Sequence, residues 1–358
     1  MALQIQLAPY SLPLACPWPD ASRDASLTQR KGWVISICDD QHRGYGDCAP
    51  LPSAGTESKA AAHTLIQQFS RRTWNSTQTL LAELERQRHA YPAACYALET
   101  AALDLHSQNA ELPLRKLLND TASDQILANA MSGSACRENT LQDQSQGFSL
   151  LKLKVGRQEL HEEIRCLKKI CAQLTPGVRL RLDANGSWTQ SEASDFLDAV
   201  AKLPVESLEE PLRNPGLIEF SQLQSRTPIT LALDESIRRM DPNELLATPA
   251  IRRLILKPGV QGGLRYSYSL AEKAAAAGKE CVVTTLVDSA VGVHAACQLA
   301  AAVDGLSPGL AHGLATSSWL CKDVACPPRI RAGRLSLSNA PGLNINEIFS
   351  ANLSGAFS

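Results

Sequence analysis

The chain has 358 residues, enough for about two domains or for one large barrel with a smaller partner. Hydrophobic residues make up 44% and charged residues 20%, which is ordinary globular usage and excludes collagen, coiled coil and wholesale disorder. Basic residues number 35 and acidic residues 36, a net charge of −1, so no basic excess is available to hold nucleic acid. No run approaches the ~18 apolar residues of a membrane span. We therefore expect neither a nucleic-acid partner nor membrane insertion.

The N-terminal residues and the cysteines indicate the cellular compartment of the protein. No basic residue precedes Arg23, and prolines interrupt the apolar stretch before it, so we expect neither a secretory signal nor a transit peptide. The 11 cysteines are scattered without a Cys-x-x-Cys pair, which is typical of reduced thiols. Both features predict a cytoplasmic protein.

Residues 1–125 read as a small α+β unit. Alternating residues at 33–37 predict a strand, the turn-rich segment 44–55 predicts a loop, and apolar spacing at 93–106 predicts a helix. No simple repeat is present in this part.

From residue 126 to 327, short β-prone runs alternate with helix-length segments. Their starts recur every ~25 residues, the length of a strand plus a crossover helix in a parallel array. The predicted strands are 126–131, 150–155, 178–183, 205–209, 229–234, 253–257, 281–285 and 310–313. Eight such runs predict a TIM-like (β/α) barrel. A doubly wound open sheet is the alternative, but it would normally place a glycine-rich turn after its first strand. Residues 328–358 are expected to leave the barrel at Pro327-Pro328 and return toward the N-terminal unit.

Five consecutive predicted strands end in charged residues. In a barrel, active sites are built at the C-terminal ends of the strands. The residues in question are Lys152 and Lys154, Asp183, Glu209, Asp234 and Lys257. The lysines belong to the second and sixth strands, which are diametrically opposite in an eight-stranded barrel, and the carboxylates belong to the three strands between them.

Three neighbouring carboxylates raise one another's pKa unless a cation is present. All-oxygen ligation suits Mg²⁺, with Mn²⁺ as a possible substitute, and three protein ligands leave room for a small-molecule carboxylate substrate. Such an ion stabilises the enediolate formed when a proton is removed α to that carboxylate. We expect Lys154 to be the base, with its pKa lowered by Lys152 and by the divalent cation. A single strand-terminal Asp or Lys is more often a solvated loop residue or an ion-pair partner; the pattern of five in sequence at barrel spacing is what indicates a site.

The ordered motifs resemble those of the enolase superfamily, in its muconate-lactonising subgroup, over nearly the whole chain. They are Lys152-x-Lys154, Asp183-x-Asn185, Glu209-Glu210-Pro211, Asp234-Glu235-Ser236 and Lys257. The resemblance implies a (β/α)₇β barrel with an α+β N-terminal capping domain. It also implies that Asp183, Glu209 and Asp234 are Mg²⁺ ligands, that Lys154 is the acid and base, and that Lys257 is the lysine of the opposite face.

Within the subgroup, the chain most resembles the o-succinylbenzoate synthases of menaquinone and phylloquinone biosynthesis. This resemblance depends on segments 44–52, 55–58, 97–101 and 312–316. The implied reaction is the Mg²⁺-dependent loss of water from 2-succinyl-6-hydroxy-2,4-cyclohexadiene-1-carboxylate. Lys154 would remove the α-proton and then, once protonated, assist the departure of hydroxide. Lys257 would stabilise the intermediate as a cation placed over the ring of the substrate.

Five further residues are candidates for contact with the substrate. Arg181 alternates onto the same face as Asp183, where it could meet the substrate or a metal ligand, or form an ion pair inside the barrel. Thr284 and Thr285 end the seventh strand, where similar enzymes have small hydroxyl residues. Asn185 and Gly313 belong to the matching motifs. Segments 21–31 and 52–57 resemble a lid over the barrel mouth.

Related activities remain as alternatives. N-acylamino acid racemases and dipeptide epimerases of this superfamily also need a lysine on each face of the substrate carbon. The eighth strand, 310–314, lacks the Asp-x-Asp motif of the dipeptide epimerases, while a cycloisomerase differs only in the shape of its pocket. A Schiff-base aldolase is the alternative from another class; it would use one lysine as a nucleophile and would leave the three carboxylates unexplained.

Overall fold

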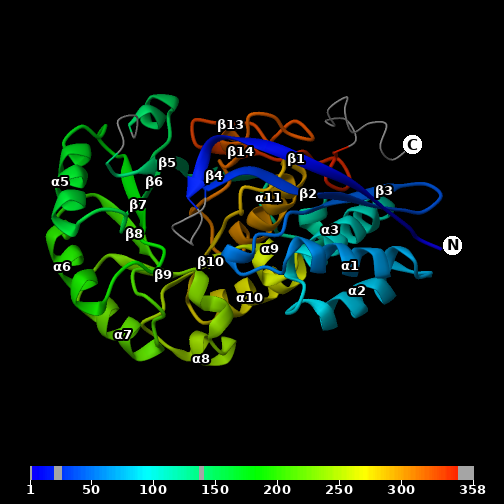
Figure 1. The fold of residues 1–358 in the computed structure, drawn as a ribbon, viewed down its shortest axis with the longest axis horizontal. Helices are drawn as coiled ribbons and strands as arrows, with labels where there is room; N and C mark the ends of the chain where they lie inside the picture. Colours follow the sequence, from blue (N-terminus) through cyan, green and yellow to red (C-terminus); the bar gives the residue numbers. More distant parts are fainter. Residues whose placement is uncertain (1, 20–25, 137–140, 346–358) are drawn as a thin grey trace.

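The computed structural model describes residues 2–19, 26–136 and 141–345, which form a curled parallel sheet ringed by helices and an N-terminal antiparallel sheet with its own helices (Figure 1). The curled sheet with α5 to α8 on its outer side occupies the left of the view, and the N-terminal helices lie at the right. The expected TIM-like barrel with an α+β capping domain is confirmed.

The capping domain is built on an antiparallel sheet with its second strand in the middle. Its strands are β1 (Gln4–Pro19), β2 (Ser26–Cys38) and β3 (Arg43–Cys48). Four helices follow, α1 (Lys59–Ser70), α2 (Thr77–Gln87), α3 (Pro92–Asn109) and α4 (Leu114–Leu118). Ser58 and Ser76 begin α1 and α2 by accepting hydrogen bonds from backbone N–H groups of the first turn. The helix expected at 93–106 is α3.

The loop expected at 44–55 is wrong for its first five residues, which belong to β3. The glycines there serve close packing of a helix on a strand rather than a turn. A Cβ at Gly44 would lie 2.1 Å from the carbonyl oxygen of Ala101, and one at Gly46 would lie 2.0 Å from that of Ala97, both in α3. The chain turns only after β3, through the short 3-10 helix η1 (Pro52–Ala54).

Seven parallel strands follow one another around the barrel in chain order. They are β5 (Ala130–Ser134), β6 (Leu150–Lys154), β7 (Arg179–Asp183), β8 (Val205–Glu209), β9 (Thr230–Leu233), β10 (Arg253–Leu256) and β11 (Glu280–Val283). The connections carry α5 (Leu160–Cys171), α6 (Gln190–Val200), α7 (Leu217–Ser225), α8 (Pro242–Ala247), α9 (Pro258–Gln261), α10 (Leu264–Ala276) and α11 (Ala290–Asp304). Short 3-10 turns are η2 (Gln142–Gln146), η3 (Glu235–Arg239) and η4 (Ser317–Trp319).

The barrel closes through a divided first strand, which corrects the single strand expected at 126–131. The segment breaks at Asn129 into β4 (Gln125–Ala128) and β5. β5 pairs with β6, whereas β4 pairs with β12 (Ala311–His312), because the Asn129 N–H donates to the carbonyl of His312 at 3.0 Å. Thr284 after β11 then bridges to Gly313 after β12. The divided strand therefore pairs with β6 through its second half and with β12 through its first half, which closes the barrel.

The residues after 328 contact both parts of the molecule. The strands β13 (Ile330–Arg331) and β14 (Arg334–Ser336) form a hairpin, and β14 pairs antiparallel with β4. Farther along, the Leu343 N–H donates to the Asp104 carboxylate of α3 at 2.8 Å, and the carbonyl of Gly342 accepts from the Leu114 N–H at 3.3 Å. The tail therefore fastens the barrel wall to the capping helices.

All 11 cysteines are free thiols. Among the helices that the structure describes, none is both long enough and apolar enough to cross a bilayer.

Candidate active site

The charged strand ends meet at one edge of the curled sheet. The parallel register places Lys154 of β6 beside Asp183 of β7, and Asp183 beside Glu209 of β8. Asp234 directly follows β9, and Lys257 directly follows β10. Because carboxyl ends of neighbouring parallel strands share one edge, five separate segments deliver their side chains to one place.

Three buried carboxylates form the centre of this site. One oxygen atom each of Asp183, Glu209 and Asp234 lies within 4.8 Å of the other two. The Lys152 ammonium lies 2.9 Å from Asp183 Oδ2 and also contacts Glu209. Burial alone would raise the pKa of Asp183, but Lys152 and Lys154 reverse that effect and hold it well below its usual range. The Asp183 carboxylate is therefore charged and counterbalanced by ammonium groups. Burial and the neighbouring Glu235 instead raise the pKa of Asp234 to about 8.

The donor set fits a hard divalent cation. The three residues offer oxygen atoms only, at a spacing that a single ion could bridge, and oxygen ligation suits Mg²⁺ or Mn²⁺ rather than zinc. A fourth carboxylate supports the set from behind, since Glu210 accepts the Asp234 N–H at 2.8 Å and is itself buried. Asp183, Glu209 and Asp234 are thus the residues that could hold a metal.

Two lysines approach the carboxylates from different strands. Lys154 Nζ donates to Asp183 Oδ2 at 2.7 Å and to Asn185 Oδ1 at 2.8 Å. Lys257 Nζ donates to Asp234 Oδ2 at 2.5 Å. Burial would lower the pKa of Lys257, but Asp234 outweighs it and holds this pKa above its ordinary value. Since β7, β8 and β9 separate β6 from β10, the ammonium groups lie on opposite sides of the carboxylate cluster.

A cavity of about 1080 Å³ opens onto this cluster between the barrel and the capping domain. The predicted site residues in its lining are Lys152, Lys154, Asp183, Asn185, Lys257, Thr284 and Thr285. The capping domain contributes Leu14, Leu27, Arg30, Leu51, Ser53 and Ala54. Two segments expected to form a lid, 21–31 and 52–57, therefore supply part of the wall, although residues 21–25 lie outside the described part of the chain.

Two predicted contact residues, Arg181 and Gly313, are not part of the cavity lining. Arg181 is fully buried, and its Nε lies 3.1 Å from a Glu206 carboxylate oxygen and 3.9 Å from Glu209 Oε1. The structure thus gives Arg181 an ion pair inside the barrel that also adjoins a candidate metal ligand. Gly313 is packed tightly, since a Cβ there would lie 2.5 Å from Thr284 Oγ1.

Sequence reasoning missed the partners of these groups. Glu235 lines the cavity, accepts a hydrogen bond from the Asn185 side chain at 3.0 Å and lies 3.9 Å from Lys257 Nζ. Glu206 also pairs with Arg253, extending the charged layer beneath the cluster. The sequence does show that Glu235 directly follows Asp234. It does not show which of these two neighbouring carboxylates contacts which lysine.

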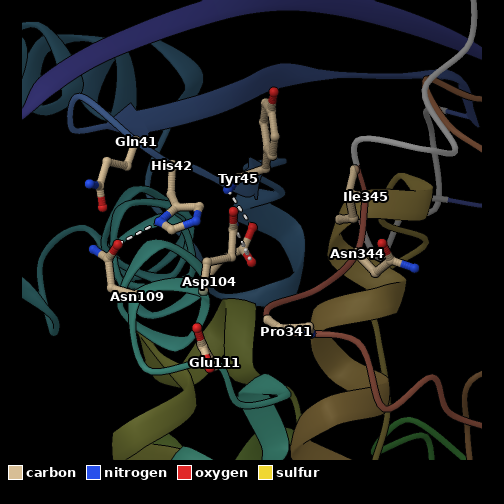
Figure 2. Close-up of a pocket in the computed structure, with 10 residues that line it drawn as sticks. Gln41, His42, Tyr45, Asp104, Asn109, Glu111, Pro341, Asn344 and Ile345 are labelled. Atoms are coloured by element: carbon tan, nitrogen blue, oxygen red, sulfur yellow. Dashed lines mark hydrogen bonds between the residues drawn. The ribbon is translucent and has the colours of Figure 1, made fainter.

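A second cavity, of about 630 Å³, lies between the capping helices and the tail (Figure 2). Burial raises the pKa of Asp104 to about 6, and its carboxylate accepts the backbone N–H groups of Tyr45 and Leu343, each at 2.8 Å. His42 Nδ1 lies 2.6 Å from Asn109 Oδ1. These bonds fasten β3 and the tail to α3, and none of the predicted site residues lines this cavity.

Two protein families match the chain. Residues 136–346 match the family described as enolase C-terminal domain-like, and residues 3–105 match the N-terminal domain family of MenC. Among curated relatives, the o-succinylbenzoate synthase of Pasteurella multocida is 26% identical over 334 residues, which cover 91% of this chain and 93% of that protein. The o-succinylbenzoate synthase of Yersinia enterocolitica is 29% identical over 304 residues, covering 83% and 86%.

Solved structures with the same fold carry other names. The L-Ala-D/L-Glu epimerase from Bacillus subtilis superposes with a TM-score of 0.85 and 22% identity, covering 96% of this chain and 98% of that one. The muconate lactonizing enzyme from Pseudomonas fluorescens superposes with a TM-score of 0.82 and 21% identity, covering 96% of each. At these identities the likeness shows the fold and leaves the reaction open.

Proposed function

Because this chain belongs to the enolase superfamily, we propose that it dehydrates 2-succinyl-6-hydroxy-2,4-cyclohexadiene-1-carboxylate to 2-succinylbenzoate, the reaction of an o-succinylbenzoate synthase. The observation that carries the proposal is a pair of lysines, Lys154 and Lys257, that flank a cluster of three buried carboxylates. Both lysines and Asp183 of this cluster line the cavity between the barrel and the capping domain. The names of the curated relatives, which span most of the chain, support the choice of substrate.

Asp183, Glu209 and Asp234 would hold Mg²⁺. When bound, the ion supplies positive charge for the substrate carboxylate as it becomes an enediolate. The amine of Lys154 takes the proton from the carbon α to that carboxylate, and the C–H electron pair moves into the carboxylate. The resulting ammonium returns the proton to the departing hydroxyl group as the C–O bond breaks. Water leaves, and Lys154 regains its starting state.

The remaining lysines have supporting roles. Hydrogen bonds to Asp183 and Asn185 aim the Lys154 side chain, so proton removal and proton return take place on one face of the ring and the elimination is syn. Lys257 remains charged beside Asp234 and stabilises the electron-rich ring from the opposite side. Lys152 contacts Asp183 and Glu209 and acts through these two carboxylates.

The rest of the substrate would meet the wall formed by the seventh and eighth strands. Thr284 Oγ1 donates to the carbonyl of Gly313 at 2.9 Å, and the Thr285 and Thr316 hydroxyls are 2.7 Å apart. Thr284 and Thr285 line the cavity, and we propose that they contact the succinyl side chain of the substrate. Asn185 lines the cavity at another wall. Arg181 would act from beneath by supporting Glu209.

We propose a separate role for each domain. We assign substrate enclosure to residues 1–125 and the chemistry to residues 126–327, with the tail from 328 linking the two. A cytoplasmic role in menaquinone or phylloquinone biosynthesis fits the free thiols and the proposed product.

Racemisation or epimerisation is the second candidate, because two lysines on opposite sides could also remove a proton from one face and return it to the other. The experiment compares kcat/KM for dehydration with that for racemisation of N-acyl amino acids and dipeptides, all with Mg²⁺. Dehydration at least about a hundredfold more efficient supports the proposal. Racemisation without dehydration would overturn it. Borohydride trapping of a substrate adduct would instead indicate a Schiff-base aldolase.

A further inference from the structure

The segment after β11 forms one wall of the active-site cavity and contains a strained residue. Thr284, Thr285, Leu286 and Val287 all line the cavity. Val287 has a φ of 60°, in the left-handed region. A β-branched side chain at such an angle is a genuine outlier, and strain of this kind persists only where the surrounding structure enforces it.

Arg30, from β2 of the capping domain, bonds to this residue. Its side chain is 3% exposed, and its Nε donates to the carbonyl of Val287 at 3.1 Å. Its other two nitrogens donate to the carbonyls of Ala49 and Pro50, at 2.7 and 3.2 Å. Asp288 lies 3.8 Å away as counter-charge. One guanidinium therefore links the barrel loop to the cap segment that leads into η1, and both line the cavity.

A second bond from the capping domain holds the backbone two residues after the strained residue. Asp47 of β3 accepts the backbone N–H of Ser289 at 2.9 Å and the hydroxyl of Tyr10 at 2.6 Å. The backbone is thus held at Val287 itself and again two residues later, by two anchors that both come from the capping domain. Neither anchor touches Lys154, Lys257 or the three carboxylates in the bonds described above.

We propose that Arg30 is a positioning residue that holds Val287 in its strained conformation and thereby fixes the cavity wall that receives the part of the substrate remote from the metal ligands. The planar guanidinium serves three carbonyls at once, which a lysine ammonium on a flexible stem cannot reproduce. Without Arg30, Val287 relaxes toward negative φ and the wall shifts, while the lysines and carboxylates stay in place. The inference concerns the loop itself; only its kinetic consequence rests on the proposed function.

The first test needs no substrate. Hydrogen exchange of the peptide 284–291 is compared between the wild-type protein and Arg30→Lys, which keeps the charge, with both proteins loaded with Mg²⁺. We expect exchange at least about tenfold faster in Arg30→Lys, since the backbone there is no longer held, and little change in the strands of the barrel. Unchanged exchange in this peptide would overturn the inference whether or not the protein dehydrates the proposed substrate.

The second test isolates the backbone strain. In the Arg30→Lys background, Val287→Gly and Val287→Ala both remove the side chain, but only glycine adopts positive φ freely. We expect KM to rise about tenfold in Arg30→Lys with kcat changed less than about threefold, and Val287→Gly to restore KM where Val287→Ala does not. Equal KM values for the two double variants would contradict the role assigned to Arg30. Fast loop exchange in a protein inactive on this substrate would support the inference while rejecting the proposed function.

Discussion

The two lysines of β6 should differ in what their removal does to stability. The Lys152 side chain is 6% exposed and serves both Asp183 and Glu209, whereas that of Lys154 is 19% exposed. In Lys152→Ala, Asp183 keeps Lys154, but the buried Glu209 keeps only Arg181 at 3.9 Å. Breaking a buried pair in this way costs about 3–5 kcal/mol. Lys154→Ala leaves Asp183 its partner Lys152, so the expected cost is about 1 kcal/mol or less.

Thermal unfolding in EDTA checks this difference. At about 2–3 °C per kcal/mol for a chain of this size, Lys152→Ala should lower Tm by roughly 6–15 °C, and Lys154→Ala by at most about 3 °C. The two variants are matched controls, because each removes one lysine from the same strand. Equal losses of Tm in both variants would refute the argument that Lys152 carries the counter-charge of the cluster.

Three further results are expected. Mg²⁺ at about 100 times its Kd should stabilise the wild-type protein by about 3 kcal/mol, and Asp234→Asn should lose most of that gain in a thermal-shift titration. Burial raises the pKa of Glu99 to about 7, so the folded protein keeps a proton that the unfolded chain releases. Stability should therefore fall by up to about 3 kcal/mol as pH rises from about 4.5 to 7, and Glu99→Gln, which can still accept the Arg265 N–H, should flatten that fall in urea unfolding. Gly46→Ala places a Cβ 2.0 Å from the Ala97 carbonyl and should lower the free energy of unfolding by about 1–3 kcal/mol in the same assay.

Each of these has an outcome that counts against it. A full Mg²⁺ response in Asp234→Asn would contradict the proposed ligand set. An undiminished slope with pH in Glu99→Gln would mean that other groups cause the dependence. Wild-type stability in Gly46→Ala would show that α3 can move away from β3 without cost.

The convergence of the charged residues could be predicted because it depends on strand order and strand ends alone. Once the strands were identified, parallel pairing was enough to bring Asp183, Glu209 and Asp234 to one edge, and the same reasoning put Lys154 and Lys257 on opposite sides. Their distances then follow from the parallel register, which sets Lys154 opposite Asp183.

Other features depend on contacts between distant segments, which local patterns do not encode. The break at Asn129 exists because β4 and β5 have different neighbours, and one of these arrives from residues 311–312. Gly46 looked like a turn residue because its packing partner, α3, is about fifty residues away in the sequence. The bond from Arg30 to Val287 joins residues 257 positions apart, and its donor appeared in the sequence as an ordinary arginine in a strand.

The most direct test of the central proposal follows the absorbance loss of 2-succinyl-6-hydroxy-2,4-cyclohexadiene-1-carboxylate with Mg²⁺, with EDTA, and with Lys154→Ala. Because Lys154 would serve two proton transfers, each worth about 10²–10⁴-fold, we expect Mg²⁺-dependent turnover that falls by at least about 10⁴-fold in the folded variant. Turnover that persists in EDTA or in Lys154→Ala would contradict the account, as would a folded, Mg²⁺-binding wild-type protein that leaves this substrate unchanged.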